Sequence, residues 1–463
     1  MRTRHRLVAI PLLAAACGGS PASDGDAGRD GGASDAPGPD GVDDEGCPSV
    51  FAQDVLPEYD VEISAPEWAA ITYEFLHRPE REAQGLDPTP YHPIELRYQG
   101  SAEAAGVMIR LKGDSSWAQA VELDPHPKMQ FVISFNEVDR HRRFHGLRKV
   151  ELDMPRDDFS FLRQRLALWY MRSLGIPAQC ANSARLVING RYYGLYTALE
   201  RMDKEFLQRK FPGASDGDLW EGGRVIKTNE DTFDPARNDA FWAVESTAEL
   251  AGLADLDASV RDWAALAMIP DTDSYYGGHH NYMLYDHPTR GFLWLPHDLD
   301  ATFDYDILEL DPIYPDRVNQ PKKHYLLVMH DPAWVARYVE DLRAARAGYD
   351  LAALEARVDA WSAQIATAAA EDEMKPFAHD DHLYAIQSLH DAPATRAAYV
   401  DAWLDCRERG GDDADGDGAI WCRECDDTTA DFGPAAAESC NLRDDDCDGY
   451  VDEHEPACPP PPQ

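Results

Sequence analysis

Positive charge is scarce in this sequence. It has 43 lysines and arginines against 84 aspartates and glutamates, which gives a net charge of −41 with neutral histidine. A surface with such an excess of carboxylates repels nucleic acids and anionic lipids. The composition therefore argues against an acidic polymer as partner and favours cations and basic protein segments.

Long apolar runs are also missing. After the first residues, no stretch approaches the roughly 20 apolar residues that a membrane-spanning helix needs. The chain begins with basic residues, a short apolar run over 7–16 and small residues before Cys17, an order that resembles a bacterial lipoprotein signal. We expect 1–17 to be a signal peptide of this type, so that the only membrane contact is a lipid on Cys17. Plain secretion is the alternative.

The composition changes along the chain and suggests its domains. Residues 18–46 have almost no large apolar side chains, so they cannot bury enough surface to order themselves and we expect a disordered acidic linker. One large folded domain is expected over 47–405. A Cys- and Asp-rich module should occupy 406–458, and a proline-rich tail 459–463.

The nine cysteines favour export. Six of them crowd into the C-terminal module, and setting Cys17 aside leaves an even number, which suits an oxidising compartment. Cys47 and Cys180 lie outside the crowd and could pair with each other. The remaining connectivity cannot be deduced from spacing.

Strand patterns dominate the first half of the main domain. Alternating or apolar runs predict strands at 59–63, 107–111 and 129–135. An Asn-Gly pair between the apolar runs 184–188 and 192–199 predicts a β-hairpin.

Helical patterns dominate the second half. An apolar face predicts a first helix at 158–174. Beyond the hairpin the pattern is mostly helical, with long helices at about 333–375 and 393–405. Short strands at 282–285 and 292–295 bracket a turn. The fold class is therefore α+β, with a strand-rich N-terminal part and a helix-rich C-terminal part.

Two acidic motifs flank the turn at 286–291. Asp273 and Asn281 precede it, and Asp298 and Asp300 follow it. A hairpin would bring Asn281 close to Asp298, and carboxylate and amide oxygens are the hard ligands that Mg²⁺ takes while it holds phosphates. A further aspartate outside the metal shell could accept a hydroxyl proton, as in kinases. Taken alone, an Asp-x-Asp motif in an acidic chain is usually a solvated turn.

Further motifs occur in an order that resembles the spore coat protein H (CotH) family of atypical protein kinases. They are Lys112-Gly-Asp-Ser-Ser116, Lys128 before a strand, Leu162-Arg-Gln-Arg-Leu166, and Asn189-Gly-Arg-Tyr-Tyr-Gly-Leu-Tyr196 followed by Glu200. The resemblance covers residues 60–305 well and extends more weakly to about 400. The sequence departs from the family at His297, where a tryptophan is usual.

The resemblance implies a kinase-like fold and transfer of the ATP γ-phosphoryl group to Ser or Thr of secreted or surface proteins, with Mg²⁺ or Mn²⁺. It makes Asp273 the catalytic base, and Asn281, Asp298 and the supporting Asp300 the metal-binding residues. The residues implied for ATP binding are Lys112, Ser115, Ser116, Lys128 and Glu200, the last near the nucleotide base. Glu200 could equally form a structural ion pair.

Two other functions stay open. One is a non-catalytic cell-surface binding or structural protein with a degenerate kinase fold, since a fold does not guarantee a reaction. The other is a metal-dependent hydrolase that uses the same acidic residues.

The C-terminal segment contains two copies of a calcium-loop pattern, Asp-x-Asp-x-Asp-Gly followed after five residues by Glu. The acidic residues of the two copies are Asp413, Asp415, Asp417 and Glu424, then Asp444, Asp446, Asp448 and Glu455. Acids at these positions give the oxygen-rich cage that Ca²⁺ prefers. Because cysteine and proline flank the loops, we expect a small disulfide-rich calcium-binding module. It resembles the Cys- and Asp-rich metal-binding repeats at the ends of exported bacterial proteins. The alternative is an acidic disordered tail.

Overall fold

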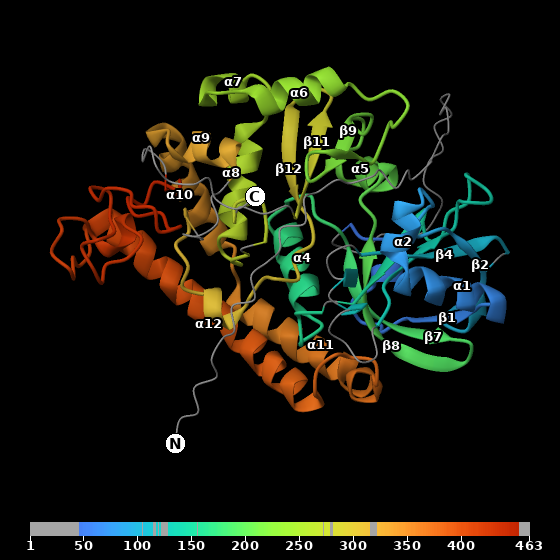
Figure 1. Ribbon diagram of the computed structural model, residues 1–463. Coiled ribbons are helices and arrows are strands. Elements are labelled where there is room, and N and C mark those ends of the chain that lie inside the picture. Colours follow the sequence, from blue (N-terminus) through green and yellow to red (C-terminus); the bar gives the residue numbers. More distant parts are fainter. Residues whose placement is uncertain are drawn as a thin grey trace.

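The computed structural model describes residues 46–103, 105–113, 117–118, 120–121, 128–154, 156–271, 273–277, 281–314 and 322–452. Figure 1 shows the N-terminal strands at one end of the molecule, most helices in the middle and the C-terminal loops, in red, at the opposite end. The expected signal peptide, nearly all of the linker and the proline-rich tail lie outside the described residues.

A sheet of eight strands forms the N-terminal part. In spatial order it contains β1 (Glu58–Glu62), β7 (Ala181–Ile188), β8 (Arg191–Glu200), β6 (Lys149–Asp153), β5 (Phe131–Ser134), β4 (Val107–Leu111), β2 (His92–Tyr98) and β3 (Ser101–Ala102). Neighbouring strands are antiparallel, but β1 and β7 are parallel. Since β1 also pairs with β2, the sheet closes on itself. All five strands predicted for this part are present.

The turn between β7 and β8 is the predicted Asn-Gly hairpin. Asn189 has a φ of 50° and Gly190 a φ of 73°, the left-handed conformation that a type I′ turn requires at both positions. The Asn189 side chain also accepts a hydrogen bond of 2.8 Å from the Ile63 amide, which ties the turn to the end of β1. Local sequence therefore fixes this hairpin.

Helices surround this sheet on the outside and on the side of the C-terminal part. α1 (Ala65–Leu76) and α2 (Arg78–Ala83) follow β1, and α4 (Arg163–Ser173) follows β6. α4 is shorter than the predicted 158–174, because the Asp158 carboxylate accepts hydrogen bonds from the Ser160 and Arg163 amides and so forms a turn before the helix.

The C-terminal part contains a second sheet of four strands that the sequence only half predicted. Its order is β10 (Val225–Ile226), β9 (Asp218–Glu221), β11 (Tyr282–His287) and β12 (Gly291–Pro296). The last two strands are the predicted pair. β9 and β10 were expected to be helical, and they are too short to show an alternating pattern.

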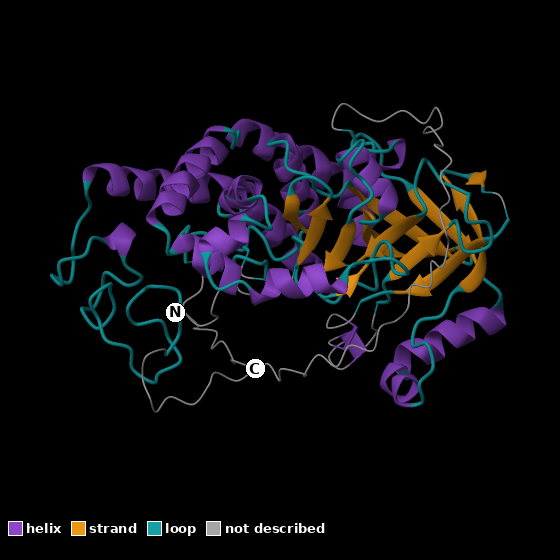
Figure 2. Cartoon of the chain, turned by 90° about the horizontal axis from the view of Figure 1, so that it is seen from above, coloured by secondary structure: helices purple, strands orange, loops and turns teal. Residues whose placement is uncertain are grey.

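Helices make up the rest of this part. They are α5 (Lys204–Lys210), α6 (Pro235–Ala243), α7 (Thr247–Ala251), α8 (Leu256–Leu266), α9 (Lys323–Met329), α10 (Pro332–Ala347), α11 (Leu351–Glu371) and α12 (His379–Arg409). Figure 2 shows most helices, in purple, gathered beside the strands, in orange. The fold is thus mixed α/β, strand-rich first and helix-rich later.

Two predicted helix boundaries are wrong. The stretch 333–375 divides into α10 and α11, and the Asp350 side chain caps the start of α11 by accepting from the Ala353 amide. The helix predicted to begin at 393 begins at His379, with Pro393 in its interior. Proline removes one helical hydrogen bond, but buried neighbours such as Leu389 and Ala397 hold the helix in place by packing.

Three disulfides are present between described residues. Cys47 pairs with Cys180 as predicted, and Cys406–Cys422 and Cys425–Cys447 fasten the C-terminal loops. Helix α12 continues to Arg409, so the expected domain boundary at 405/406 falls inside its last turn. Among the described residues, no helix has the length and apolar character needed to cross a bilayer.

We expect the double substitution Cys47→Ser and Cys180→Ser to lower the free energy of unfolding by about 2–5 kcal/mol. The bond closes a loop of 133 residues between two fully buried positions, so its loss frees the unfolded chain. Urea unfolding followed by tryptophan fluorescence measures the change. An unchanged urea midpoint would contradict the prediction. The variant Cys406→Ser/Cys422→Ser, which opens a loop of only 16 residues, should lose less.

Candidate active site

The β11–β12 hairpin brings the two acidic motifs together. Tyr282 lies opposite Pro296 at the end of this ladder, so Asn281 just before β11 and Asp298 just after β12 become neighbours. The Asn281 Nδ2 donates a hydrogen bond of 3.3 Å to the backbone oxygen of Asp298. The expected approach of these two residues is confirmed.

Asn281 also holds the first acidic motif. Its Nδ2 donates to Asp273 Oδ2 at 2.7 Å, and its backbone N–H donates to the Asp273 oxygen at 3.2 Å. A single asparagine side chain therefore contacts both Asp273 and Asp298, which lie on different loops.

Asp298 sits at a bend of the backbone. Its φ is 53°, a conformation that is uncommon for residues other than glycine, although aspartate tolerates it. The bend turns its side chain toward α4, where Gln164 Nε2 donates to Asp298 Oδ1 at 3.1 Å. Helix α4 thus positions the second acidic motif.

Asp271 is a member of the site to which sequence reasoning gave no role. It is fully buried, its Oδ1 accepts from the Asp273 N–H at 2.8 Å, and its Oδ2 has no hydrogen-bond partner among the described residues. Burial, with the carboxylates of Asp273 and Asp298 adding to it, raises the pKa of Asp271 to about 8. Its position two residues before Asp273 is the sequence feature that could have identified Asp271 as part of the site.

Lys112 supplies the positive charge of the site. Its Nζ lies 3.0 Å from Glu151 Oε2 and 3.3 Å from Asp153 Oδ1, both on β6. Burial alone would lower the pKa of Lys112, but Asp153, Glu151 and also Asp298 raise it. Lys112 was predicted to be near the phosphates, and it does lie beside the acidic cluster. Glu151 and Asp153 were not predicted.

The carboxylates outnumber this cation. Burial, and after it Asp298, raises the pKa of Asp153 to about 6 despite the opposing effect of Lys112. Burial and the neighbours Asp298 and Asp153 also raise the pKa of Asp300. Asp300 therefore lies within the electrostatic reach of the same cluster, in which the carboxylates outnumber the two cations, Lys112 and an Arg201 guanidinium 2.9 Å from Glu151 Oε1.

Lys128 is placed elsewhere, and the predicted phosphate contact is contradicted. Its side chain has no exposed surface, and its Nζ donates to Asp372 Oδ2 and to the Leu195 oxygen, each at 2.7 Å. The Nζ also lies 4.4 Å from the centre of the Tyr196 ring. Because the Lys128 ammonium forms a buried ion pair with Asp372, it is not available to bind a phosphate.

Glu200 is likewise unavailable to a nucleotide through its side chain. It is fully buried, its Oε2 accepts from the Cys180 N–H at 3.0 Å, and Arg209 forms an ion pair with it. The structural ion pair, left open above, is what the structure shows. Ser115 and Ser116 lie outside the described residues.

Groups of three acidic side chains with oxygens within 4.8 Å of one another occur in the C-terminal module among the described residues. They are Asp413–Asp415–Asp427, Asp415–Asp417–Glu424 and Glu438–Asp444–Asp446. Asp427 and Glu438 were not predicted. Asp448 accepts a hydrogen bond from the Tyr450 N–H, and Glu455 lies outside the described residues.

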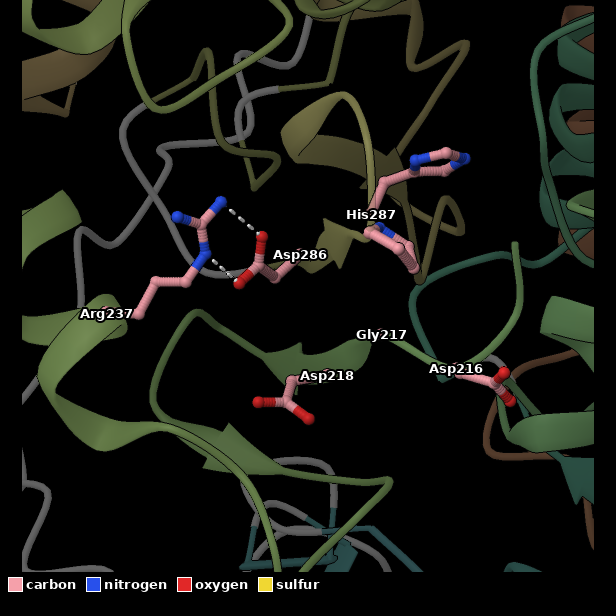
Figure 3. Close-up of a pocket in the computed structure, with 7 residues that line it drawn as sticks. Asp216, Gly217, Asp218, Arg237, Asp286 and His287 are labelled. Carbon is pink, nitrogen blue, oxygen red and sulfur yellow. Dashed lines mark hydrogen bonds and ion pairs between the residues drawn. The ribbon is translucent and has the colours of Figure 1, made fainter.

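A polar cavity lies at the far end of β11 from Asn281. Its volume is about 330 Å³, and it is lined by Asp216, Asp218, Arg237, Asp286 and His287. Figure 3 shows Arg237 and Asp286 facing each other in a two-pronged ion pair. Because this arginine is already paired, the cavity has no free cation for an anionic ligand, and it is separate from the acidic site.

The fold and the site define a mixed α/β protein in which acids from two loops and one strand converge beside a lysine. A family model described as "CotH kinase protein" matches residues 109–401. This is more than half of the 463 residues. The chain belongs to the CotH kinase protein family.

A relative and a solved structure extend this comparison. The chain is 28% identical over 210 residues to the inner spore coat protein H of Bacillus subtilis, covering 39% of this chain and 56% of that protein. The chain thus spans little more than half of the relative. The Helicobacter pylori proinflammatory kinase CtkA aligns with 60% of this chain and 93% of its own, at 10% identity and a TM-score of 0.33. Similarity at this level does not establish a shared fold.

We expect Lys128→Met to cost about 3–5 kcal/mol of folding free energy, because it leaves the Asp372 carboxylate buried without its cation. Lys112→Met should cost less, since the Lys112 side chain keeps 21% of its surface exposed. Urea unfolding of both variants tests the contrast. The double variant Lys128→Met/Asp372→Asn should recover part of the loss, and a Lys128→Met protein as stable as the wild type would show that the pair is not structural.

Proposed function

We propose that the protein is an exported kinase that transfers the γ-phosphoryl group of ATP to Ser or Thr residues of secreted or surface proteins. The observation that carries the proposal is the contact of one side chain, Asn281, with both Asp273 and Asp298. Membership of a kinase family supports the reaction class. The substrate class rests on the cellular location argued below.

The residues at the site fit a divalent cation. The donors are carboxylate and amide oxygens, the hard ligands of Mg²⁺ and Mn²⁺. Two buried oxygens beside Asp298, Asp271 Oδ2 and Gln164 Oε1, have no hydrogen-bond partner among the described residues. Buried oxygens without partners are costly, and a cation would satisfy them. The metal would be held by Asn281 through its amide oxygen, with Asp298 and Asp300, and would neutralise phosphate charge.

The other roles follow from the position of each side chain. Asp273, fixed by Asn281, is the base that accepts the proton of the substrate hydroxyl. Lys112 lies within the electrostatic reach of Asp298, and its charge would offset that of the ATP phosphates. Glu151 and Asp153 position the Lys112 ammonium through the ion pairs described above. Lys128 and Glu200 have no part in this assignment.

The proposed location rests on the cysteines and the N-terminus. Disulfides are consistent with an extracellular protein. The relative from Bacillus subtilis carries the name of a spore coat protein, which is a surface location. We place the chain in the cell envelope through a lipid on Cys17, or in the medium if it is secreted without one.

We expect Asp273→Asn to lower phosphate transfer by about 10²–10⁴-fold, because the amide cannot take up the hydroxyl proton. Asp298→Asn should weaken binding of ATP with Mg²⁺ or Mn²⁺ as well. Labelled ATP with a Ser-rich protein measures transfer, and calorimetry measures nucleotide binding. Glu340→Gln, an exposed change on α10, is the matched control and should leave both unchanged.

Three results would overturn the kinase proposal. Absence of nucleotide binding in the wild type would support the non-catalytic surface protein. Phosphate release from esters without ATP would support the metal-dependent hydrolase. Undiminished transfer by both aspartate variants would show that the reaction, if any, uses another site.

A further inference from the structure

The first acidic loop of the C-terminal module is closed by its own backbone. The Asp413 carboxylate accepts hydrogen bonds from the Gly416 N–H at 2.7 Å and the Gly418 N–H at 3.1 Å. Asp415 accepts from the Asp417 N–H at 3.0 Å. These bonds shape the loop, but they occur in many acidic turns and do not by themselves indicate a ligand.

Glu424 provides the independent observation. Only 5% of this residue is exposed, yet no N–H or hydroxyl donor among the described residues reaches either carboxylate oxygen, and the side chain within hydrogen-bonding reach is a second carboxyl group, that of Asp427. One of its oxygens lies within 4.8 Å of oxygens of Asp415 and Asp417. Burying a carboxylate without a donor or a cation is strongly unfavourable. The buried Glu424 carboxylate therefore indicates a binding site for a cation.

Asp427 is a further candidate ligand that lies outside the calcium-loop pattern. It forms a second group with Asp413 and Asp415 within the same 4.8 Å limit. Its Oδ1 also accepts from the Ala414 N–H at 2.7 Å, which fixes it against the loop. Since Asp415 belongs to both groups, the two groups overlap and together contain five carboxylates.

The donors distinguish between metals. All of them are carboxylates, and a shell of many oxygens suits Ca²⁺, which takes six to eight, better than Mg²⁺, which keeps several waters. The nearby Cys422 and Cys425 are held in disulfides, so they cannot act as thiolate ligands for zinc.

We propose that Asp413, Asp415, Asp417, Glu424 and Asp427 form a Ca²⁺ site in the C-terminal module. This goes beyond the proposed kinase function and does not depend on it. Asp427 is the ligand that the loop pattern does not contain.

The site faces the main domain across a cavity of about 230 Å³. Glu309 and Asp311 line it on the side of the main domain, and Glu424, Asp426 and Asp427 on the side of the module. Carboxylates therefore line this cavity on both sides.

The second acidic loop contains no comparable buried carboxylate without a donor among the described residues. Both Glu438 oxygens accept backbone hydrogen bonds, Oε1 from Asp445 and Asp446 and Oε2 from Asp452. Its buried charge is therefore already satisfied by donors. The proposal concerns the first loop alone.

The test is a titration of the full-length protein, stripped with EDTA, with CaCl₂ in a calorimeter. We expect Glu424→Gln and Asp427→Asn to remove one binding event or weaken it by at least about ten-fold, because the ligand charge falls. The exposed Asp431→Asn change in the same module is the matched control. Unchanged stoichiometry and affinity for Ca²⁺ in both ligand variants would overturn the site.

A glycine pair provides a second probe. A Cβ at Gly433 would lie 2.5 Å from Asp417 Oδ2 and 3.3 Å from Glu424 Oε2, whereas a Cβ at Gly410 would meet nothing within 4 Å. Both glycines have positive φ, so both alanine variants carry backbone strain. We expect Gly433→Ala to weaken Ca²⁺ binding and Gly410→Ala to leave it unchanged. Equal affinities in the two variants would contradict the proposal.

Thermal unfolding separates binding from misfolding. In EDTA, Glu424→Gln should be at least as stable as the wild type, because it removes a buried carboxylate that lies among the carboxylates of Asp415, Asp417 and Asp427. Added CaCl₂ should raise the Tm of the wild type but raise that of Glu424→Gln less. If Glu424→Gln is less stable than the wild type in EDTA, the carboxylate has a structural partner and the proposal fails.

Discussion

The register of the β11–β12 hairpin is the constraint on which the site depends. With Tyr282 opposite Pro296, the residue before one strand and the bend after the other meet, and the Asn281 side chain joins them. A slip of one residue would turn each side chain of β12 to the opposite face of the sheet. β12 is buried on both faces, with Phe292 and Trp294 in one core cluster and Leu293 and Leu295 in another, so such a slip would exchange aromatic and aliphatic side chains between two packed cores. Burial of this strand therefore secures the geometry of the acidic loops.

Negative charge is the second constraint. The pKa of Asp153 is raised to about 6 and that of Asp271 to about 8, in both cases by burial first and by neighbouring carboxylates next. Lys112 is the ammonium that lies against this cluster, and it cannot compensate every carboxylate. The cluster is thus poised to gain a cation, which is the electrostatic requirement of a site for metal and phosphate. The same reasoning applies to the first loop of the C-terminal module.

Local patterns predicted most of the strands and the approach of Asn281 to Asp298, because a hairpin is determined by residues close in sequence. The sequence could not place Lys128 correctly. Its partner Asp372 lies 244 positions away, and Lys112 and Lys128 look alike beside adjacent strands. Which of them faces the site depends on tertiary packing. Asp427 was missed for a different reason, since it lies outside the calcium-loop pattern and joins the site only through the fold of the module.

The start of helix α12 at His379 could not be foreseen either, because Pro393 suggested a boundary that packing overrides.

Helix α12 also connects the segments around the acidic site with the C-terminal module. Arg396 on this helix is fully buried, and its guanidinium donates to the backbone oxygens of Ala267, Leu308 and Leu310. Ala267 lies shortly before the first acidic motif, and Leu308 and Leu310 lie shortly after the second.

The chain then continues from Leu310 to Tyr314, which packs against Gly449 of the second acidic loop. Helix α12 itself ends near Cys406, whose disulfide with Cys422 fastens the module. The Cys406–Cys422 disulfide at the end of the helix and the packing of Tyr314 against Gly449 therefore join the module to the main domain at two places, and Arg396 links the two segments that lead to them.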